Sequence, residues 1–290
     1  MPGNDDGRPN VNEAAVSTPG PVAPSPAASP SGQGWAGVLA TRFAYFVGGL
    51  AIMFGLWWAA TTVAGLDPKS SHWAGFGPVA ALKALVKMWT DGVIQKALLA
   101  SGYRMGIGLG IAIAIGVPVG ILMGRSRRFR ELSNSPFQLM RMVSPMSWEP
   151  IAVIVFAGWE PAIIFLIAIA AVWSVTFSTA AGLAKVDPAW FKVARNLGAK
   201  PWHVVTQIIV PAIAFDVLTG IRLAVGVAWI VLVPAEFLGV RSGLGYTIED
   251  ARETLEFDHL MAMILVIGAV GYAMDSALVA LIRRTSWHKQ

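Results

Sequence analysis

Charged residues are scarce in this chain of 290 residues, and cysteine is absent. Lys, Arg, Asp and Glu make up 13% of the sequence, against about 25% in a soluble globular protein. Hydrophobic residues make up 55%, and the mean hydropathy is +0.60. This composition predicts a polytopic membrane protein, whose helices satisfy their own backbone polar groups within lipid. Without cysteine there is no disulfide framework, no thiolate nucleophile and no thiolate metal site, and the redox compartment is undetermined.

Motifs for catalysis, metal binding and nucleotide binding are also missing. The four histidines are scattered singly, and no spacing indicates a metal site. No Ser/His/Asp array is present, so we expect no catalytic residue. No G-x-x-x-x-G-K-[ST] phosphate-binding loop occurs, so we expect no cofactor in this chain, and any ATP would be bound by another subunit. The net charge of +5 does not indicate nucleic acid, because the cations lie beside apolar segments, where they fix membrane topology.

The first 34 residues differ in composition from the rest of the chain. They are rich in Pro, Ser, Ala and Gly, and such a segment cannot bury enough apolar area to offset its conformational entropy. They open with Asp5, Asp6 and Arg8 and lack an apolar core before a cleavage site, unlike a signal peptide. We therefore predict a disordered cytoplasmic tail over residues 1–34 and a transmembrane domain over residues 35–290.

Six apolar segments predict an all-α fold with about six transmembrane helices, because about 20 apolar residues cross the hydrocarbon core. The third segment is interrupted by Arg141, Pro145 and Glu149-Pro150. Residues 79–89 predict an interfacial amphipathic helix in the loop after the first segment. The segments cover about residues 43–63, 99–123, 136–157, 162–183, 212–238 and 260–282.

Glycines recur in the second apolar segment at four-residue spacing. Gly116, Gly120 and Gly124 share this spacing, and Gly106 and Gly110 continue the pattern. Glycine at this spacing lets another helix approach closely in lipid. We expect a tight packing seam along this face.

Clusters of Lys and Arg at the segment ends set the orientation. They fall on one side of the membrane if the chain alternates, and that side is expected to be cytoplasmic, with both termini. The lysine-containing loop after the first segment departs from this pattern. The chain is expected to cross the membrane several times. The cations are Arg125, Arg127, Arg128 and Arg130, then Lys185, Lys192, Arg195 and Lys200, and finally Arg283, Arg284 and Lys289.

A polar, amphipathic stretch over residues 187–206 separates the fourth and fifth segments. Asp187-Pro188 suits a helix start, since Asp caps free amides and Pro fits the first helical position. Gly198 is expected to end this helix in a left-handed turn, and Pro201-Trp202 to begin a second short helix. Such a compact knob on the membrane face would be held by a cytoplasmic partner.

This stretch resembles the EAA loop of binding-protein-dependent ABC importer permeases, read as E-A-A, three residues, G, nine residues, I-x-L-P. Lys192 and Val193 replace the glutamate and first alanine, while Gly198 falls on the glycine. The resemblance covers about residues 95–285 and extends to the nitrate/sulfonate/taurine/bicarbonate branch. Its further segments are Ser144-Pro145-Met-Ser-Trp148-Glu-Pro150, Thr219-Gly-Ile-Arg222, Ala235-Glu236 and Gly243-Leu-Gly245.

The resemblance implies a half-transporter of the bacterial inner membrane with a type I ABC importer permease (MetI-like) core. Two permease chains, a homodimer by family habit, would form the pathway. Two ATP-binding subunits, holding ATP and Mg, would grip the 187–206 loops, and a periplasmic or lipid-anchored solute-binding protein would deliver solute. The coupling residues that it implies are Lys192, Val193, Ala194, Arg195, Gly198, Ala199, Ile208 and Pro211.

Charged and polar residues inside the apolar segments are candidates for the translocation pathway, because a charge at mid-membrane costs at least about 2.5–3.5 kcal/mol. An anion pathway needs a positive lining, which favours Arg141 and Arg222 over the carboxylates. Alternatives stay open. Arg141 would lie at the interface beside headgroups or a carboxylate, and Glu236 would either have a gating role or contact Arg104 or Arg241. The candidates are Arg141, Ser144, Ser147, Trp148, Glu149, Arg222 and Glu236.

The sequence thus favours an importer permease for a small anion such as nitrate, bicarbonate, cyanate, a sulfonate or taurine. An importer of an organic solute such as an aromatic carboxylate is the main alternative. A passive channel would not need the cytoplasmic knob. A membrane-embedded enzyme would need charges clustered at one depth, whereas those here are scattered.

Overall fold

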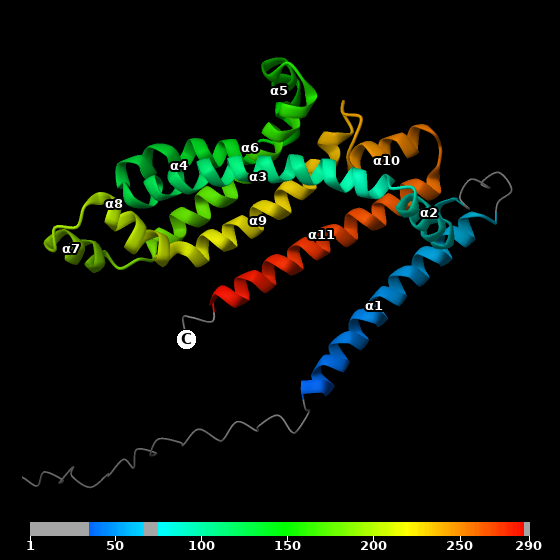
Figure 1. Cartoon of the computed structure of the whole chain (residues 1–290), viewed down its shortest axis with the longest axis horizontal. Helices are drawn as coiled ribbons and strands as arrows, with labels where there is room; N and C mark the ends of the chain where they lie inside the picture. The colour runs from blue at the N-terminus through cyan, green and yellow to red at the C-terminus, as the bar shows by residue number, and fades with distance from the viewer. Residues whose placement is uncertain (1–34, 67–74, 287–290) are drawn as a thin grey trace, which may run out of the picture. The chain divides into compact units, whose positions relative to one another are not determined.

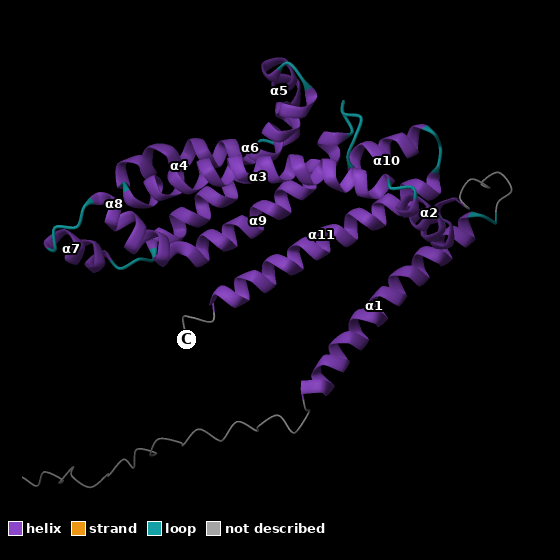
Figure 2. Cartoon of the chain, viewed as in Figure 1, coloured by secondary structure: helices purple, strands orange, loops and turns teal. Residues whose placement is uncertain are grey.

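The computed structural model describes residues 35–66 and 75–286, and all regular structure within them is helical (Figures 1 and 2). The predicted disordered tail over residues 1–34 lies outside the described residues. Contacts divide the chain into one unit that ends at Phe54 and a second that begins at Gly55. The second unit contains every side chain discussed below.

Within the described residues, five helices are long and apolar enough to cross a membrane. They confirm the all-α fold and five of the six predicted segments. Their spans end close to the predicted limits, with the last three beginning at Trp159, Pro201 and Phe257. The helices are α1 (Trp35–Ala64), α3 (Val93–Arg125), α6 (Trp159–Ala184), α9 (Val210–Glu236) and α11 (Phe257–Ser286).

The third predicted segment is a bent pair of helices, which makes a sixth span if the pair crosses the membrane as one unit. α4 (Arg127–Met142) and the segment Pro145–Phe156, which contains α5 (Glu149–Phe156), meet at 92°. Ser144 precedes Pro145 and has ψ 129°, outside the helical region, as expected for a residue before proline. The interruption that the prolines predict is therefore confirmed, and it turns the chain sharply.

α3 packs against α6 along a row of small residues (Figure 1). A Cβ atom added at Gly108 would lie 2.6 Å from Ile167 Cγ2, and one at Gly120 would lie 2.6 Å from the Thr176 carbonyl oxygen. The same row includes Ala112, Gly116 and Gly124, so only small residues let the two helices come this close.

Two glycines of the predicted seam do not belong to it. A Cβ atom at Gly106 or Gly110 would meet nothing within 4 Å. Both lie two residues away from the four-residue row through Gly116, which corresponds to roughly 200° around a helix with 3.6 residues per turn. Continued toward the N-terminus, the row passes through Gly108 and reaches Arg104, whose side chain is buried.

α6 also packs closely against α9, with glycine at two crossing points. A Cβ atom at Gly220 would lie 2.6 Å from Ser178 Cβ, and one at Gly182 would lie 2.6 Å from Asp216 Cβ. Buried aliphatic residues of α3, α6 and α9, among them Ile167, form one continuous core. These three helices are therefore tightly packed together.

A second core joins the ends of several helices. The predicted amphipathic helix over residues 79–89 is α2 (Pro78–Thr90), and it packs on α11. Its buried Ala84 and Met88 meet Leu244 of α10 (Leu244–Glu253) and Met263 of α11. This cluster lies at the opposite end of the second unit from α7 and α8 (Figure 1).

Candidate functional site

The predicted knob contains two short helices joined at a glycine. α7 (Pro188–Asn196) begins after Asp187, whose carboxylate accepts a hydrogen bond from the Ala189 amide (2.8 Å). Gly198 has φ +70°, the left-handed conformation that a non-glycine residue rarely adopts. The helix start and the glycine stop are both confirmed.

The end of α7 is a Schellman motif. The Gly198 amide donates to the Arg195 carbonyl (3.0 Å), and the Ala199 amide donates to the Ala194 carbonyl (3.0 Å). These bonds satisfy carbonyl groups that the helix end would otherwise leave free. The turn after α7 is therefore fixed by backbone hydrogen bonds as well as by the glycine.

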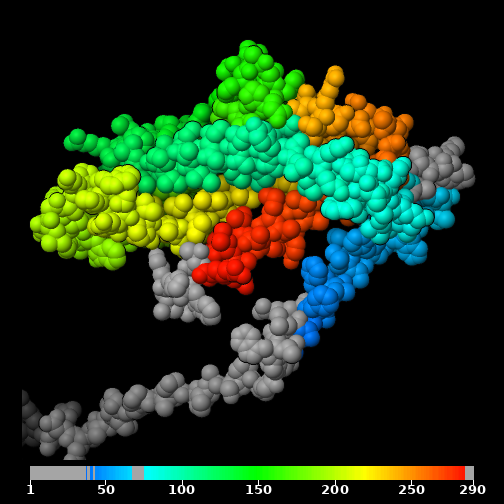
Figure 3. Space-filling model, viewed as in Figure 1, coloured from blue at the N-terminus to red at the C-terminus, as the bar shows by residue number. Residues whose placement is uncertain are grey.

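The chain leaves this turn and runs without a break into a membrane-spanning helix. α8 (Pro201–Val204) is followed by a π-helical turn (Val205–Ile209), which continues directly into α9. We call residues 187–209 the elbow. In the space-filling view it occupies one end of the second unit, in yellow-green, far from the orange α10 (Figure 3).

The elbow exposes large apolar side chains on the side away from its own core. Trp190 is 57% exposed, Val193 56%, Leu197 80% and Trp202 71%. On the other side, Phe191 packs against a small core with other elbow residues. The exposed cations among these apolar residues are Lys192, Arg195 and Lys200. An exposed apolar surface of this kind, rimmed by polar residues, marks an interaction site.

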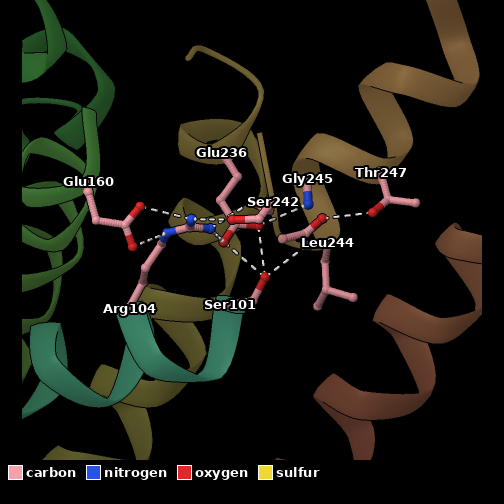
Figure 4. Close-up of polar contacts among 9 residues, drawn as sticks. Ser101, Arg104, Glu160, Glu236, Ser242, Leu244, Gly245 and Thr247 are labelled. Atoms are coloured by element: carbon pink, nitrogen blue, oxygen red, sulfur yellow. Dashed lines mark hydrogen bonds and ion pairs between the residues drawn. The ribbon is translucent and has the colours of Figure 1, made fainter. Parts of the chain in front are cut away.

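An ionic network with a buried centre lies near the other end of α9 (Figure 4). The Arg104 side chain is 2% exposed and Glu236 is completely buried, and Arg104 Nη1 lies 2.6 Å from Glu236 Oε1. Arg104 also donates to both oxygens of Glu160 (3.0 and 2.9 Å), whose side chain is 48% exposed. Two further bonds go to the carbonyl and hydroxyl of Ser242.

These contacts use all five N–H groups of the guanidinium. The Glu236 carboxylate accepts from the Gly245 amide (2.9 Å) and the Ser101 hydroxyl (2.8 Å), and Ser101 in turn accepts from the Leu244 amide (2.8 Å). A buried charge is tolerated when it is paired and hydrogen-bonded in this way. The network thereby ties α3, α6, α9 and α10 together.

The Gly243-Leu-Gly245 segment fits closely around this carboxylate. Gly243 has φ +115°, and a Cβ atom there would lie 2.4 Å from Glu236 Oε2. A Cβ atom at Gly245 would lie 2.2 Å from the Val233 carbonyl oxygen. Only glycine lets the backbone come close enough to donate to Glu236, which explains both glycines physically.

A cavity of about 180 Å³ lies between the bent pair and the α6–α9 pair. Arg141 and Trp148 line it, together with Trp173 and Ser174 of α6. The Arg141 guanidinium lies 5.6 Å from the centre of the Phe177 ring. The cavity is thus small, cationic and partly aromatic.

The other predicted pathway residues lie elsewhere. Ser144 and Ser147 are exposed in the bend, and Glu149 begins α5. Arg222 forms two hydrogen bonds with Asp275 of α11 (2.8 and 2.9 Å). None of these residues, nor Glu236, lines the cavity with Arg141.

These contacts decide one alternative that the sequence left open: Glu236 contacts Arg104 rather than Arg241. Arg222 pairs with Asp275, which lies on another helix. Asp216 pairs with Lys185 just after α6 (2.6 Å).

Sequence reasoning missed Ser101, Glu160 and Ser242 in the network. A signal existed for Glu160, which is the one charged residue in the short loop after the third segment. Arg104 is likewise isolated near the start of an otherwise uncharged segment. Because Arg104 and Glu160 are isolated charges of opposite sign near the ends of apolar segments, an ion pair between them could have been predicted.

Comparison with known proteins agrees with this architecture. Residues 116–287 match the model of the family described as binding-protein-dependent transport system inner membrane component. The chain is 32% identical over 260 residues, 88% of its length and 93% of the relative's, to the taurine transport system permease protein TauC of Escherichia coli (strain K12). It is 34% identical over 208 residues, 71% of its length and 75% of the relative's, to the putative aliphatic sulfonates transport permease protein SsuC of Bacillus subtilis (strain 168).

A third relative and the solved structures extend this picture. The chain is 35% identical over 179 residues, 61% of its length and 64% of the relative's, to the bicarbonate transport system permease protein CmpB of Synechococcus elongatus. In fold it resembles a chain of the inward-facing MetNI methionine ABC transporter, with a TM-score of 0.57, 14% identity and coverage of 68% of this chain and 96% of the other. An amino acid ABC transporter crystallised with histidines gives a TM-score of 0.53 at 16% identity, covering 69% and 95%.

The chain therefore belongs to the binding-protein-dependent transport system inner membrane components. It is a multi-pass permease component of an ABC importer, and it works with solute-binding and ATPase partners.

Proposed function

We propose that this permease carries a small oxyanion across the inner membrane and that a separate ATPase drives it through the elbow. The observation that supports the coupling role best is the exposure of Trp190, Val193, Leu197 and Trp202 on an element continuous with α9. A protein surface that covers these side chains would remove their apolar area from water, and the cations beside them suit the cytoplasmic side.

The elbow is suited to transmit force because its turn is stiff. The Schellman bonds fix the end of α7, and the π-helical turn joins α8 to α9 without an intervening loop. A partner that moves the elbow would therefore move α9 as well. The predicted coupling residues Lys192, Val193, Arg195 and Gly198 are all exposed, whereas Ala194 is buried beneath them.

The orientation follows from the cationic segment ends. Arg125 ends α3, and Lys185 directly follows α6. Figure 1 shows that these two helix ends lie at the same end of the second unit as the elbow. Cytoplasmic loops carry an excess of Lys and Arg. We place this end, and both termini, in the cytoplasm, and the buried Arg104–Glu236 network near the opposite membrane surface.

The cavity beside Arg141 is our candidate for the solute pathway. Its volume of about 180 Å³ leaves room for several water molecules and therefore for a small anion. A guanidinium with neighbouring indole rings and a hydroxyl would bind a carboxylate, bicarbonate or sulfonate group. The relatives named for taurine, sulfonate and bicarbonate transport support this solute class.

The proposed assembly has two copies of this chain, two ATPase subunits and one solute-binding protein on the side opposite the elbow. ATP and magnesium would be held in the ATPase subunits, because the sequence has no phosphate-binding loop. Membrane lipid surrounds the spans. An importer of a larger organic anion remains the alternative, and it would need the cavity to widen during transport.

Substitution of Gly198 tests the coupling role. A Cβ atom there meets nothing within 4 Å, so a side chain acts only through the backbone, which has φ +70°. Gly198→Val is expected to distort the elbow, because a β-branched residue is strained in this conformation by about 1–2 kcal/mol. Gly198→Asn is the matched control, since Asn tolerates the left-handed region.

The measurements are retention of the ATPase subunit during purification and ATP-dependent anion uptake by proteoliposomes. Gly198→Val should weaken both, while Gly198→Asn should behave like the wild type. Normal retention and uptake in a well-folded Gly198→Val protein would refute the coupling role. Anion flux without ATP would instead support a passive channel.

A further inference from the structure

A second cavity, of about 420 Å³, lies where the elbow meets the end of α3. Ile121 of α3 and Val204, Val205 and Ile209 of the elbow give it an apolar wall. Arg125 and Arg195 also line it. The proposed transport function does not use this cavity, although two of its lining residues, Arg195 and Ala199, belong to the predicted coupling residues.

The Phe191 ring contacts one of the two arginines and shares a helix face with the other. The Arg125 guanidinium lies 5.3 Å from the centre of the Phe191 ring. Phe191 and Arg195 are four residues apart on α7, so they share a face of that helix. The ring and both arginines line the cavity together.

Neither arginine is neutralised by a carboxylate in the described part of the chain. The ion pairs there involve Arg104, Arg127, Arg222, Arg252, Lys185 and His259. Arg125 and Arg195 therefore present two uncompensated positive charges beside an apolar wall. A ligand that matches this lining has an anionic head and an apolar body.

The depth of the cavity in the membrane narrows the class of ligand that could bind there. The span that contains α3 ends at Arg125, the span of α6 ends at Ala184, and the next span begins at Pro201. The cavity therefore lies where the spans leave the hydrocarbon, at the level of the headgroups. Basic pockets between transmembrane helices on the cytoplasmic side bind anionic lipid headgroups.

We propose that this cavity binds an anionic phospholipid. Arg125 and Arg195 hold the phosphate, and the acyl chain lies against Ile121, Val205 and Ile209. Because the cavity joins the end of α3 to the elbow, the bound lipid holds these two elements together. The site rests on the proposed cytoplasmic orientation of this end of the chain and not on the transported solute or on coupling to an ATPase.

Thermal unfolding of the purified chain, delipidated in a neutral detergent, tests this site. Phosphatidylglycerol in large excess is expected to raise the Tm of the wild type by roughly 5 °C or more, because a ligand that binds only the folded state stabilises it. Phosphatidylcholine with the same acyl chains should have little effect. The variant R125Q/R195Q should lose the phosphatidylglycerol response.

R128Q/R130Q is the matched control, because it removes two exposed charges from the neighbouring helix α4 that do not line the cavity. It should respond like the wild type. Ala199→Leu keeps both arginines but fills the cavity that Ala199 lines. It should also lose the response, and it provides the test if R125Q/R195Q does not fold.

Three results would overturn the proposal. The first is an undiminished response of R125Q/R195Q or of Ala199→Leu. The second is an equal effect of phosphatidylcholine, which would show that headgroup charge is not recognised. The third is a full response to inorganic phosphate alone, which would identify a site for a free anion instead of a lipid.

Discussion

Replacement of Glu236 by Gln is the sharpest test of the buried network. The change keeps the shape of the side chain and removes its charge. Arg104 is then left with Glu160 as its counter-charge, and the Glu160 side chain is 48% exposed. The side-chain amide that Glu236→Gln introduces also cannot satisfy its surroundings. If its oxygen faces Arg104, its NH2 group faces the Gly245 amide, and two donors meet.

Removal of one partner from a buried ion pair costs about 3–5 kcal/mol, because the remaining charge is left buried. At the lower limit of about 3 kcal/mol, the Tm of a domain of this size falls by roughly 6–12 °C. Glu160→Gln removes the other negative charge that Arg104 contacts, but from a half-exposed position. Its cost should be about 1 kcal/mol, the upper end of the range for exposed ion pairs.

The assay is thermal unfolding of both variants in detergent, followed by tryptophan fluorescence, with size-exclusion chromatography to confirm folded starting material. The expected order is wild type, then Glu160→Gln slightly lower, then Glu236→Gln much lower. A Glu236→Gln protein within roughly 2 °C of the wild type, a shift worth no more than about 1 kcal/mol, would refute the reasoning. So would equal losses for the two variants.

Two further predictions concern the helix seam and the solute cavity. Gly120→Ala should lower the free energy of unfolding by about 1–3 kcal/mol through overpacking against α6, whereas Gly110→Ala, which meets nothing within 4 Å, should be neutral or stabilising in the same thermal assay. Arg141→Gln should lower anion uptake by proteoliposomes roughly tenfold, the loss of one charge-assisted hydrogen bond worth about 1.5 kcal/mol. The partner ATPase should still hydrolyse ATP in the presence of this variant. Arg128→Gln is the control and should leave uptake unchanged. Unchanged uptake in Arg141→Gln would exclude Arg141 from the pathway.

Most of the fold could be predicted because its signals are local. Hydrophobic runs located five spans, and Asp187-Pro188 and Gly198 located both ends of α7. The bent pair was harder, since length and hydropathy describe residues 136–157 as one span. Pro145 and Pro150 indicated a break, but the 92° angle depends on tertiary packing that no local pattern contains.

The candidate sites were less predictable because their members come from distant helices. Ser101 and Glu236 are separated by 135 positions and meet through one hydroxyl. A serine near a span end carries no signal of such a contact. The spacing of the glycines was visible in the sequence, but the face they occupy was not, and Gly106 and Gly110 were therefore placed wrongly in the seam.

The two ends of α9 connect the elbow to the buried network. Its 27 residues correspond to a rod of about 40 Å. Close contacts at Gly182 and Gly220 fasten this rod to α6, so a pull on the elbow, as proposed, would move α6 and α9 as one body. The bent pair meets this body around the Arg141 cavity. Relative motion at that boundary would reshape the cavity, while the Arg104–Glu236 network holds the far end. Such a rigid-body movement of one group of helices against another is a common way to switch between two conformations.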